Sequence, residues 1–349
     1  MHTLSGADSG VLDESLGRLR RAGPEYGGTL TNHAPMVVEA LLCLGRPESV
    51  EPWLTGYLPH LDERPRAVAP VCEADWGAAL GDLRRVTDWQ AFFARQLAEH
   101  EWTDVLGRWW PALLPGVAAG ATHGVIRTAH AARALAAASS PQRLAELGTA
   151  LAYWAARYTA LPGEQRSAGT LAPGRAVEQL PLHPDGVHPG LIRERLGTLD
   201  RVGGFPAAVA ALRPPQAVDA AMSELVGVFA RVLLTHGRRW PTAFVHAVTA
   251  PAAARSVLPL LPPQARRATH DSLWQLAAGL YAVHAPDARV EPLPSGEPPA
   301  VDDLVERAVA NGDEHAIKLT EACVREYRST GDGMLLHAAD RGLALLPEL

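Results

Sequence analysis

The stretch DWQAFFARQLAEHEWTDVLGRWW, residues 88–110, decides the fold class of this 349-residue chain. Its apolar residues recur at intervals of three and four, which is the period of an amphipathic helix. Pro111 follows directly, and proline lacks a backbone donor and clashes with the preceding helical turn. We therefore expect a single helix over residues 88–110 that ends at Pro111.

The same helical period recurs along most of the chain, whereas alternating β-branched runs bounded by turn residues are absent. Proline and glycine gather between the helical stretches, and residues 161–190 are the best candidate for a long loop or lid. We predict an all-α protein, with a single large multi-helix domain over residues 1–349 (core about 30–330) that surrounds a buried site. The other predicted helices cover residues 116–138, 141–159, 217–235, 242–260, 265–284, 299–310 and 313–328.

Composition and charge argue against several classes of protein. The chain has 32 basic and 38 acidic residues, a net charge of −6, and no basic block that would bind nucleic-acid phosphates. No apolar stretch reaches the roughly 18 residues that a membrane span needs, and acidic residues interrupt the place of a secretory signal. Cys43, Cys72 and Cys323 are far apart and form no CxxC pair, so we expect buried, reduced thiols in a cytoplasmic protein.

Lys318 is the only lysine in a chain whose other basic residues are all arginine. Both residue types serve equally on a solvated surface, but only lysine carries an amine that can lose its proton near neutral pH. A leftover surface lysine is the ordinary explanation. The alternative is that this position needs amine chemistry.

Four of the 14 histidines lie in apolar helical surroundings on separate segments. These are His33, His123, His246 and His315, and the last precedes Lys318 by three residues, which places both on one helix face. A hydrogen-bonded core histidine is the ordinary explanation for any one of them. Four together indicate a metal site, because neutral imidazole is the commonest metal ligand.

Two further histidines are alternatives for one of these four positions. His130 follows His123 by seven residues on the same helix face, and His270 lies next to Asp271 near a helix start. The chain has two asparagines, Asn32 and Asn311, each within four residues of a predicted ligand. Capping of a helix or turn is their ordinary role.

Four motifs in chain order resemble the questin oxidase-like family: LTNHAPMVVEAL, THGVIRTAHAAR, FVHAVTAPAAAR and DEHAIKLTEAC. The resemblance covers residues 30 to 330 and implies an all-α oxygenase that acts on anthraquinone-like aromatic polyketides with O2. One branch of the family implies a nonheme Fe(II) dioxygenase that opens the ring. By this resemblance the iron ligands are His33, His123, His246, His315 and Lys318, the last as a CO2-derived carbamate.

The residues fit this ligand set on chemical grounds as well. A neutral lysine amine adds CO2 to give a carbamate, whereas arginine stays protonated and cannot do so. Four imidazoles and one anionic oxygen suit Fe(II) better than Zn(II), which prefers four ligands in structural sites. We expect the four ring nitrogens to converge within about 2.0–2.3 Å of one metal, with Lys318 and His315 as the catalytic residues.

Three other interpretations stay open. A second branch of the family implies Baeyer–Villiger-type oxygen insertion with NADPH, which is also a candidate external reductant for the iron enzyme; no GxGxxG motif for a built-in cofactor domain is present. A metal-free Schiff-base enzyme would use Lys318 as its amine but would leave the histidines unexplained. A helical binding protein for aromatic metabolites would need no chemistry at all.

Overall fold

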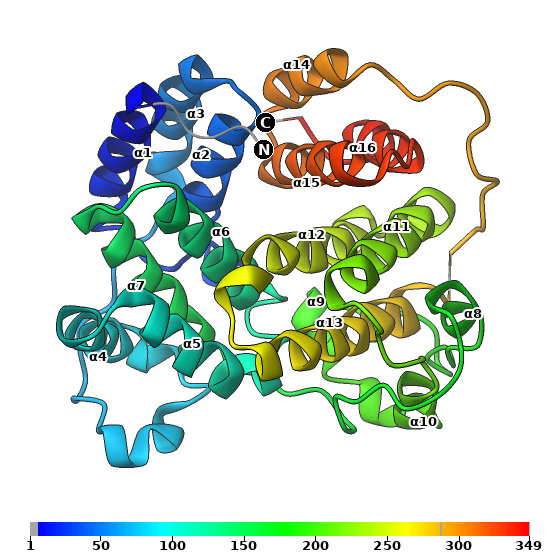
Figure 1. Ribbon diagram of the computed structural model, residues 1–349, viewed down its shortest axis with the longest axis horizontal. Coiled ribbons are helices and arrows are strands. Elements are labelled where there is room, and N and C mark those ends of the chain that lie inside the picture. Colours follow the sequence, from blue (N-terminus) through cyan, green and yellow to red (C-terminus); the bar gives the residue numbers. More distant parts are fainter. Residues whose placement is uncertain (1–5, 287, 349) are drawn as a thin grey trace. The chain divides into compact units, whose positions relative to one another are not determined.

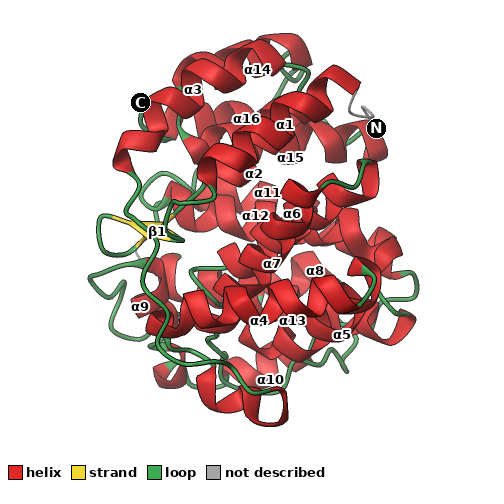
Figure 2. Cartoon of the chain, turned by 90° about the vertical axis from the view of Figure 1, so that its left-hand side faces the viewer, coloured by secondary structure: helices red, strands yellow, loops and turns green. Residues whose placement is uncertain are grey.

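The computed structural model describes residues 6–286 and 288–348, and its regular structure is almost entirely helical. Figure 2 shows red helices throughout, with strand confined to one small hairpin. Within these described ranges the hairpin consists of β1 (Glu25–Tyr26) and β2 (Leu30–Thr31), which pair antiparallel. The all-α prediction is confirmed. None of the helices in these ranges is long and apolar enough to cross a membrane.

Contacts between residues divide the chain into two compact units, Met1–Thr159 and Ala160–Leu349. In the first unit α4 and α6 pack on α7, and α1 and α6 pack on α2 (Figure 1). The prediction of a single domain over residues 1–349 stays a prediction. The helices of the first unit are α1 (Gly6–Leu19), α2 (Ala34–Cys43), α3 (Val50–Tyr57), α4 (Val86–Glu99), α5 (Trp102–Leu113), α6 (His123–Ala137) and α7 (Pro141–Ala156).

The second unit is built around α12, which packs against α11, α13 and α15. The helix α16 packs in turn against α11 and α15. This arrangement places α12 and α15 side by side, so residues of these two helices can form one site. The helices of this unit are α8 (Pro173–Glu178), α9 (Ile192–Leu196), α10 (Phe205–Ala210), α11 (Val218–His236), α12 (Pro241–Val257), α13 (Pro263–His284), α14 (Val301–Asn311), α15 (Glu314–Thr330) and α16 (Met334–Leu345).

The stretch that decides the fold class forms two helices, α4 and α5, and the prediction of one helix over residues 88–110 is wrong. His100 and Glu101 adopt extended backbone angles between the helices, so the chain turns while its apolar period continues. The ring of Trp109 on α5 thereby packs at 5.2 Å from Phe92 and 5.1 Å from Phe93 on α4. Pro111 does not end α5, which continues to Leu113 with the proline inside it.

The helix predicted over residues 116–138 begins only at His123. Gly120, Ala121 and Thr122 have φ values of 56°, 54° and 80°, which are left-handed and incompatible with a right-handed helix. The prediction of a loop over residues 161–190 holds only in part, because this segment contains the short helix α8. Its other parts are attached to α13, for example by the Ser167 hydroxyl, which donates to Asp271 Oδ1 at 2.6 Å.

A buried ion cluster joins α2 to α6. Arg133 Nε on α6 donates to Glu39 Oε1 on α2 at 2.7 Å, and Arg133 Nη2 contacts the other carboxylate oxygen. His130 Nδ1 lies 2.8 Å from Glu39 Oε2. The helix α2 directly follows His33, and α6 begins with His123. The cluster therefore fixes these two histidine positions relative to each other.

The three cysteines form no disulfide within the described part of the chain. Cys323 is buried as predicted, but Cys43 is half-buried and Cys72 is exposed, so the expectation of three buried thiols is wrong for these two. Cys72 lies in the connection between α3 and α4, outside any long helix, so its neighbours in sequence do not cover it.

We predict that Trp109→Ala lowers the free energy of unfolding by about 3–5 kcal/mol, because it removes a fully buried ring and leaves a cavity. Chemical denaturation measures this loss. Trp102→Ala, a half-buried ring on the same helix, is the control and should lose much less. Equal losses in both variants would show that the aromatic contacts of α4 and α5 do not stabilise the first unit.

The Glu39 cluster predicts a pH-dependent stability. Burial alone raises the pKa of Glu39, but the charges and hydrogen bonds of Arg133 and His130 outweigh it and hold the pKa well below its ordinary value of 4.5. As the pH falls, Glu39 therefore takes up its proton in the unfolded chain before it does so in the folded chain. The stabilisation by the ionised Glu39 is complete at a pH well above 4.5 and is progressively lost as the pH falls through and below this value. The difference in unfolding free energy between the wild type and Glu39→Gln should shrink from pH 7 to pH 4. Parallel curves over this range would contradict the assignment.

Candidate metal centre

His33 occupies the residue before α2, where several hydrogen bonds fix its backbone. Its N–H donates to the Tyr57 hydroxyl at 3.2 Å. The preceding Asn32 donates from Nδ2 to the Gly23 carbonyl and accepts from the Ala34 N–H, each at 3.0 Å. Asn32 thus forms the cap-like turn that its residue type predicts, and this turn aims the imidazole of His33.

His123, the first residue of α6, faces His33 directly. The two Nε2 atoms are 2.8 Å apart, and the rings stand almost perpendicular, with centroids 4.5 Å apart. Two ligands at right angles around an ion, each at about 2.1 Å, lie about 3.0 Å apart. The pair therefore has the spacing of neighbouring ligands on one metal. Both side chains are buried.

The backbone before His123 is strained. Ala121 and Thr122 are the non-glycine residues with positive φ in the part of the chain that the structure describes. Such residues cost roughly 1–3 kcal/mol each and persist only where their surroundings require them. Here the strained turn brings the carbonyl of Gly120 to 2.6 Å from His123 Nδ1. That contact places the proton of a neutral His123 on Nδ1 and leaves Nε2 as the ligand atom.

In the second unit, α12 and α15 bring His246, His315 and Lys318 together. The rings of His246 and His315 have centroids 5.2 Å apart and an interplanar angle of 81°. Lys318 follows His315 by one helical turn on α15, as predicted from the sequence. The charge of Lys318 contributes to lowering the pKa of His246 on the neighbouring helix.

The N-terminus of α15 adds two carboxylates to this group. Asp313 caps the helix by accepting from the N–H groups of His315 and Ala316 at 2.9 and 3.0 Å. Asp313, Glu314 and His315 each offer one potential ligand atom, and these atoms lie within 4.8 Å of one another. Asn311 Oδ1 accepts from the Asp313 N–H at 3.1 Å, so this asparagine also has its predicted turn role.

Burial makes the bases of this group weak. It lowers the pKa of His246 to about 3, with a further contribution from the charge of Lys318. It also lowers the pKa of Lys318 to about 8, although Glu314 and Asp313 oppose the shift. The Lys318 side chain is 2 % exposed, and its Nζ has no hydrogen-bond partner among the described residues. Both groups lose their protons easily. The deprotonated imidazole is the form that binds a metal, and the deprotonated amine is the form that reacts with CO2.

Within each unit the structure thus assembles one group of the predicted ligands. His33 and His123 meet in the first unit, and His246, His315 and Lys318 meet in the second. The convergence of all five on one ion stays a prediction. The two alternative ligands have other partners: His130 lies in the Glu39 cluster, and His270 Nδ1 lies 3.0 Å from Asp271 Oδ1.

Sequence reasoning missed His284, at the end of α13. The side chain is fully buried, and its Nε2 has no hydrogen-bond partner in the described ranges. Burial lowers its pKa to about 4, and protonation of His284 at lower pH would in turn disfavour protonation of His246. His284 therefore belongs to the surroundings of the second group. The apolar run LYAVH, which ends at this residue, is the signal that could have indicated its burial.

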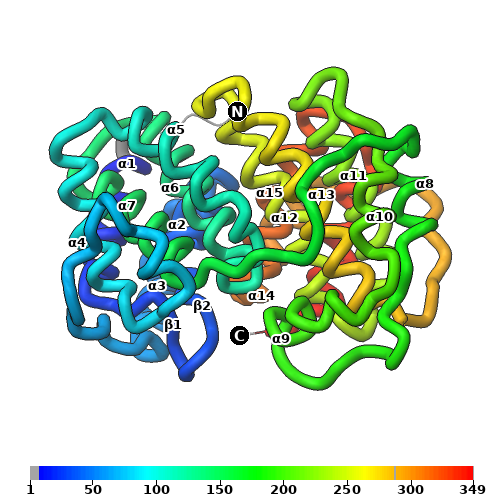
Figure 3. Tube along the Cα trace, turned by 90° about the horizontal axis from the view of Figure 1, so that it is seen from below, coloured from blue at the N-terminus to red at the C-terminus, as the bar shows by residue number. Residues whose placement is uncertain are grey.

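Sequence reasoning also missed the hairpin that precedes His33. Gly27 and Gly28 have φ values of 56° and 80°, which suit a tight turn between two strands. β1 and β2 lie side by side in Figure 3, and the register pairs Glu25 with Thr31. The Gly-Gly pair, which favours a tight turn between strands, is the signal that could have predicted this hairpin.

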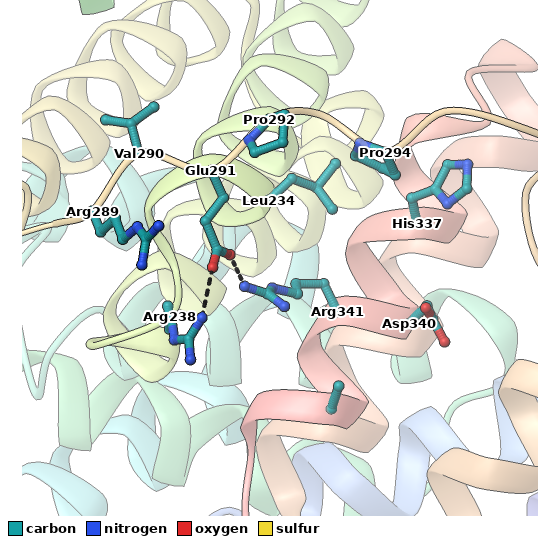
Figure 4. A pocket seen from close by; sticks show the side chains of 11 residues that line it. Leu234, Arg238, Arg289, Val290, Glu291, Pro292, Pro294, His337, Asp340 and Arg341 are labelled. Atoms are coloured by element: carbon teal, nitrogen blue, oxygen red, sulfur yellow. Dashed lines mark hydrogen bonds and ion pairs between the residues drawn. The ribbon is translucent and has the colours of Figure 1, made fainter.

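Two cavities are lined by residues other than the five predicted ligands. A cavity of about 570 Å³ in the second unit is lined by residues of α11, α16 and the segment before α14. Figure 4 shows Glu291 at its centre, where the carboxylate accepts from Arg238 at 3.0 Å and also contacts Arg341. A single side-chain carboxylate thus already forms ion pairs with both of these arginines. A cavity of about 410 Å³ in the first unit lies among α1, α4 and α7.

Comparison with known proteins adds no relative to these observations. No protein-family model matches the chain, and no curated protein matches it significantly. The resemblance to the questin oxidase-like family therefore stays a prediction that rests on four sequence motifs and their order.

Proposed function

We propose that this chain is an Fe(II)-dependent oxygenase that cleaves, or inserts oxygen into, a ring C–C bond of an anthraquinone-like aromatic polyketide. The observation that carries the proposal is the amine of Lys318, which is buried, without a hydrogen-bond partner among the described residues, and easily deprotonated. An ordinary lysine avoids such a place, because burial of an unpaired ammonium group is costly. A modified lysine that carries a carboxylate explains it.

The modification balances without another reactant. The neutral amine of Lys318 attacks CO2, an N–C bond forms as one C–O π bond opens, and a proton of the amine passes to water, which gives a carbamate anion. Asp313 and Glu314 lie close enough to influence the pKa of this lysine, so their charges oppose a second anion. A divalent cation would reverse this repulsion, and imidazoles, carbamate and carboxylates are ligands that suit Fe(II).

The histidines of both groups suit the same role. The pKa of His246, about 3, keeps it neutral over the whole physiological range, and the Gly120 carbonyl orients His123 with Nε2 as the ligand atom. Bound iron would supply the one-electron chemistry that O2 needs in order to react with an aromatic ring. The buried positions of His33, His123 and His246 would keep bulk water from these ligands.

The same amine also favours a second candidate, Schiff-base catalysis. A buried lysine with a pKa near 8 can attack a carbonyl carbon and lose water to form an imine. Borohydride traps an imine irreversibly and does not trap a carbamate. Reductive trapping of a carbonyl substrate on Lys318 would therefore support this candidate and contradict the oxygenase.

We predict that Lys318→Arg lowers bound iron and O2 uptake together, each by about tenfold or more, because arginine keeps the charge but forbids a carbamate. Lys318→Glu, with a carboxylate on a shorter arm, should recover some iron but little uptake. Arg328→Lys, an exposed change on the same helix, is the matched control. Labelling with ¹³C-bicarbonate should give a carbamate signal in the wild type and none in Lys318→Arg. Full iron content and uptake in Lys318→Arg would contradict the proposal.

We predict that both histidine pairs hold the same ion. His33→Ala and His246→Ala should each abolish iron binding, because either change removes a ligand from a shared centre. Iron analysis of purified protein measures this, with His60→Ala, an exposed position, as the control. If each variant kept half of the iron of the wild type, the two groups would be separate sites and the proposed centre would be wrong.

A further inference from the structure

A chain of hydrogen-bonded side chains in the first unit links Arg157 to His123. It runs through Glu25, Tyr153 and Thr31, which are all buried. The hairpin creates it: the register of β1 and β2 pairs Glu25 with Thr31, and paired residues present their side chains on one face. The Tyr153 hydroxyl on α7 lies 2.9 Å from Glu25 Oε1 and 2.8 Å from Thr31 Oγ1.

We propose that Glu25, Tyr153 and Thr31 are positioning residues that fix the Nδ1-protonated tautomer of His123 and so present Nε2 as its ligand atom. The tautomer follows from the hydrogen bonds of this chain together with the Gly120 carbonyl, without reference to any bound ion. The identity of the ion at Nε2 rests on the proposed function.

The direction of every hydrogen bond in the chain is determined from its charged end. Arg157 Nε donates to Glu25 Oε1 at 2.6 Å and its Nη2 contacts the other oxygen, so this carboxylate only accepts. Tyr153 must therefore donate its single hydroxyl hydrogen to Glu25. Burial and the charge of Glu25 raise the pKa of Tyr153, which keeps that hydrogen in place.

The remaining hydrogen bonds follow in order. Because Tyr153 has used its hydrogen, Thr31 must donate its own to the Tyr153 oxygen. Thr31 Oγ1 then offers only lone pairs to His123 Nδ1, which lies 3.2 Å away. The carbonyl of Gly120 offers lone pairs to the same nitrogen at 2.6 Å. Nδ1 must therefore carry the proton, and Nε2 holds the lone pair that faces His33.

The strained turn and this chain depend on each other. A Cβ atom at Gly120 would lie 2.6 Å from the Tyr153 hydroxyl oxygen, so this position excludes any larger residue. With glycine, the backbone approaches Tyr153 closely, and the left-handed residues Ala121 and Thr122 return the chain to the start of α6. The tyrosine hydroxyl thus has a role in the position of the Gly120 carbonyl as well as in the order of the donors.

The test uses Tyr153→Phe in the metal-free full-length protein, with the ¹⁵N shifts of the His123 ring as the measurement. Without the tyrosine oxygen, the Thr31 hydroxyl loses its acceptor and turns its hydrogen toward Nδ1. We expect the tautomer of His123 to shift toward Nε2–H. Tyr158→Phe, which removes a hydroxyl outside the chain, is the matched control and should leave the spectrum of His123 unchanged.

A second substitution separates this role from a general loss of packing. In Thr31→Val/Tyr153→Phe no hydroxyl is left to turn toward Nδ1, and the Gly120 carbonyl should restore the Nδ1–H tautomer. A merely structural effect of Tyr153→Phe would persist or grow in the double variant. An unchanged tautomer in Tyr153→Phe, or no return in the double variant, would overturn the proposal.

Fe(II) affinity gives an independent readout. Loss of the outer partners of a ligating histidine typically costs about 10–100-fold in metal affinity, and we expect this loss in Tyr153→Phe and a partial recovery in the double variant. If the tautomer shifts as predicted but the wild type binds no iron, the proposed function fails and the positioning role stands. If the wild type binds iron and Tyr153→Phe binds it equally well with an unchanged tautomer, the positioning role fails and the proposed function stands.

Discussion

The burial of nitrogen bases is the constraint on which this structure depends. An ammonium group without a partner is costly in a protein interior, yet Lys318 lies in α15 with only 2 % of its side chain exposed. Its easy deprotonation, and the low pKa values of His246 and His284, are the consequence of that burial. A protein that needed these residues only for packing would be more stable with apolar ones. The free-energy cost of burying these bases is explained if their deprotonated forms bind a metal ion or CO2.

In the first unit the main structural feature is the set of hydrogen bonds that orients the imidazole of His123. The β1–β2 hairpin places Glu25 and Thr31 on one face, and α7 brings Tyr153 to both. The charge of Glu25 then determines every donor up to His123. This negative charge, three hydrogen bonds away, thus favours the same tautomer as the Gly120 carbonyl, in which the Nε2 lone pair faces His33. The strained turn at Ala121 and Thr122 is part of the same arrangement.

The sequence predicts the helices better than their contacts. The spacing of DEHAIK correctly places His315 and Lys318 on one turn of one helix, and the helical period correctly predicts an all-α chain. The break at His100 and the late start of α6 escape prediction, because an apolar period continues across two extended or left-handed residues. Glu25 and Tyr153 are 128 residues apart, and no local pattern indicates that they meet. The buried state of His284 likewise depends on tertiary packing.

Diffraction from crystals grown with Fe(II) and bicarbonate without oxygen, measured on both sides of the iron absorption edge, tests the central claim most directly. The account predicts one anomalous peak within about 2.0–2.3 Å of ring nitrogens of His33, His123, His246 and His315, and density for a carboxylate on Lys318 Nζ. A peak at any other place, or an unmodified Lys318 beside a fully occupied iron, would contradict it.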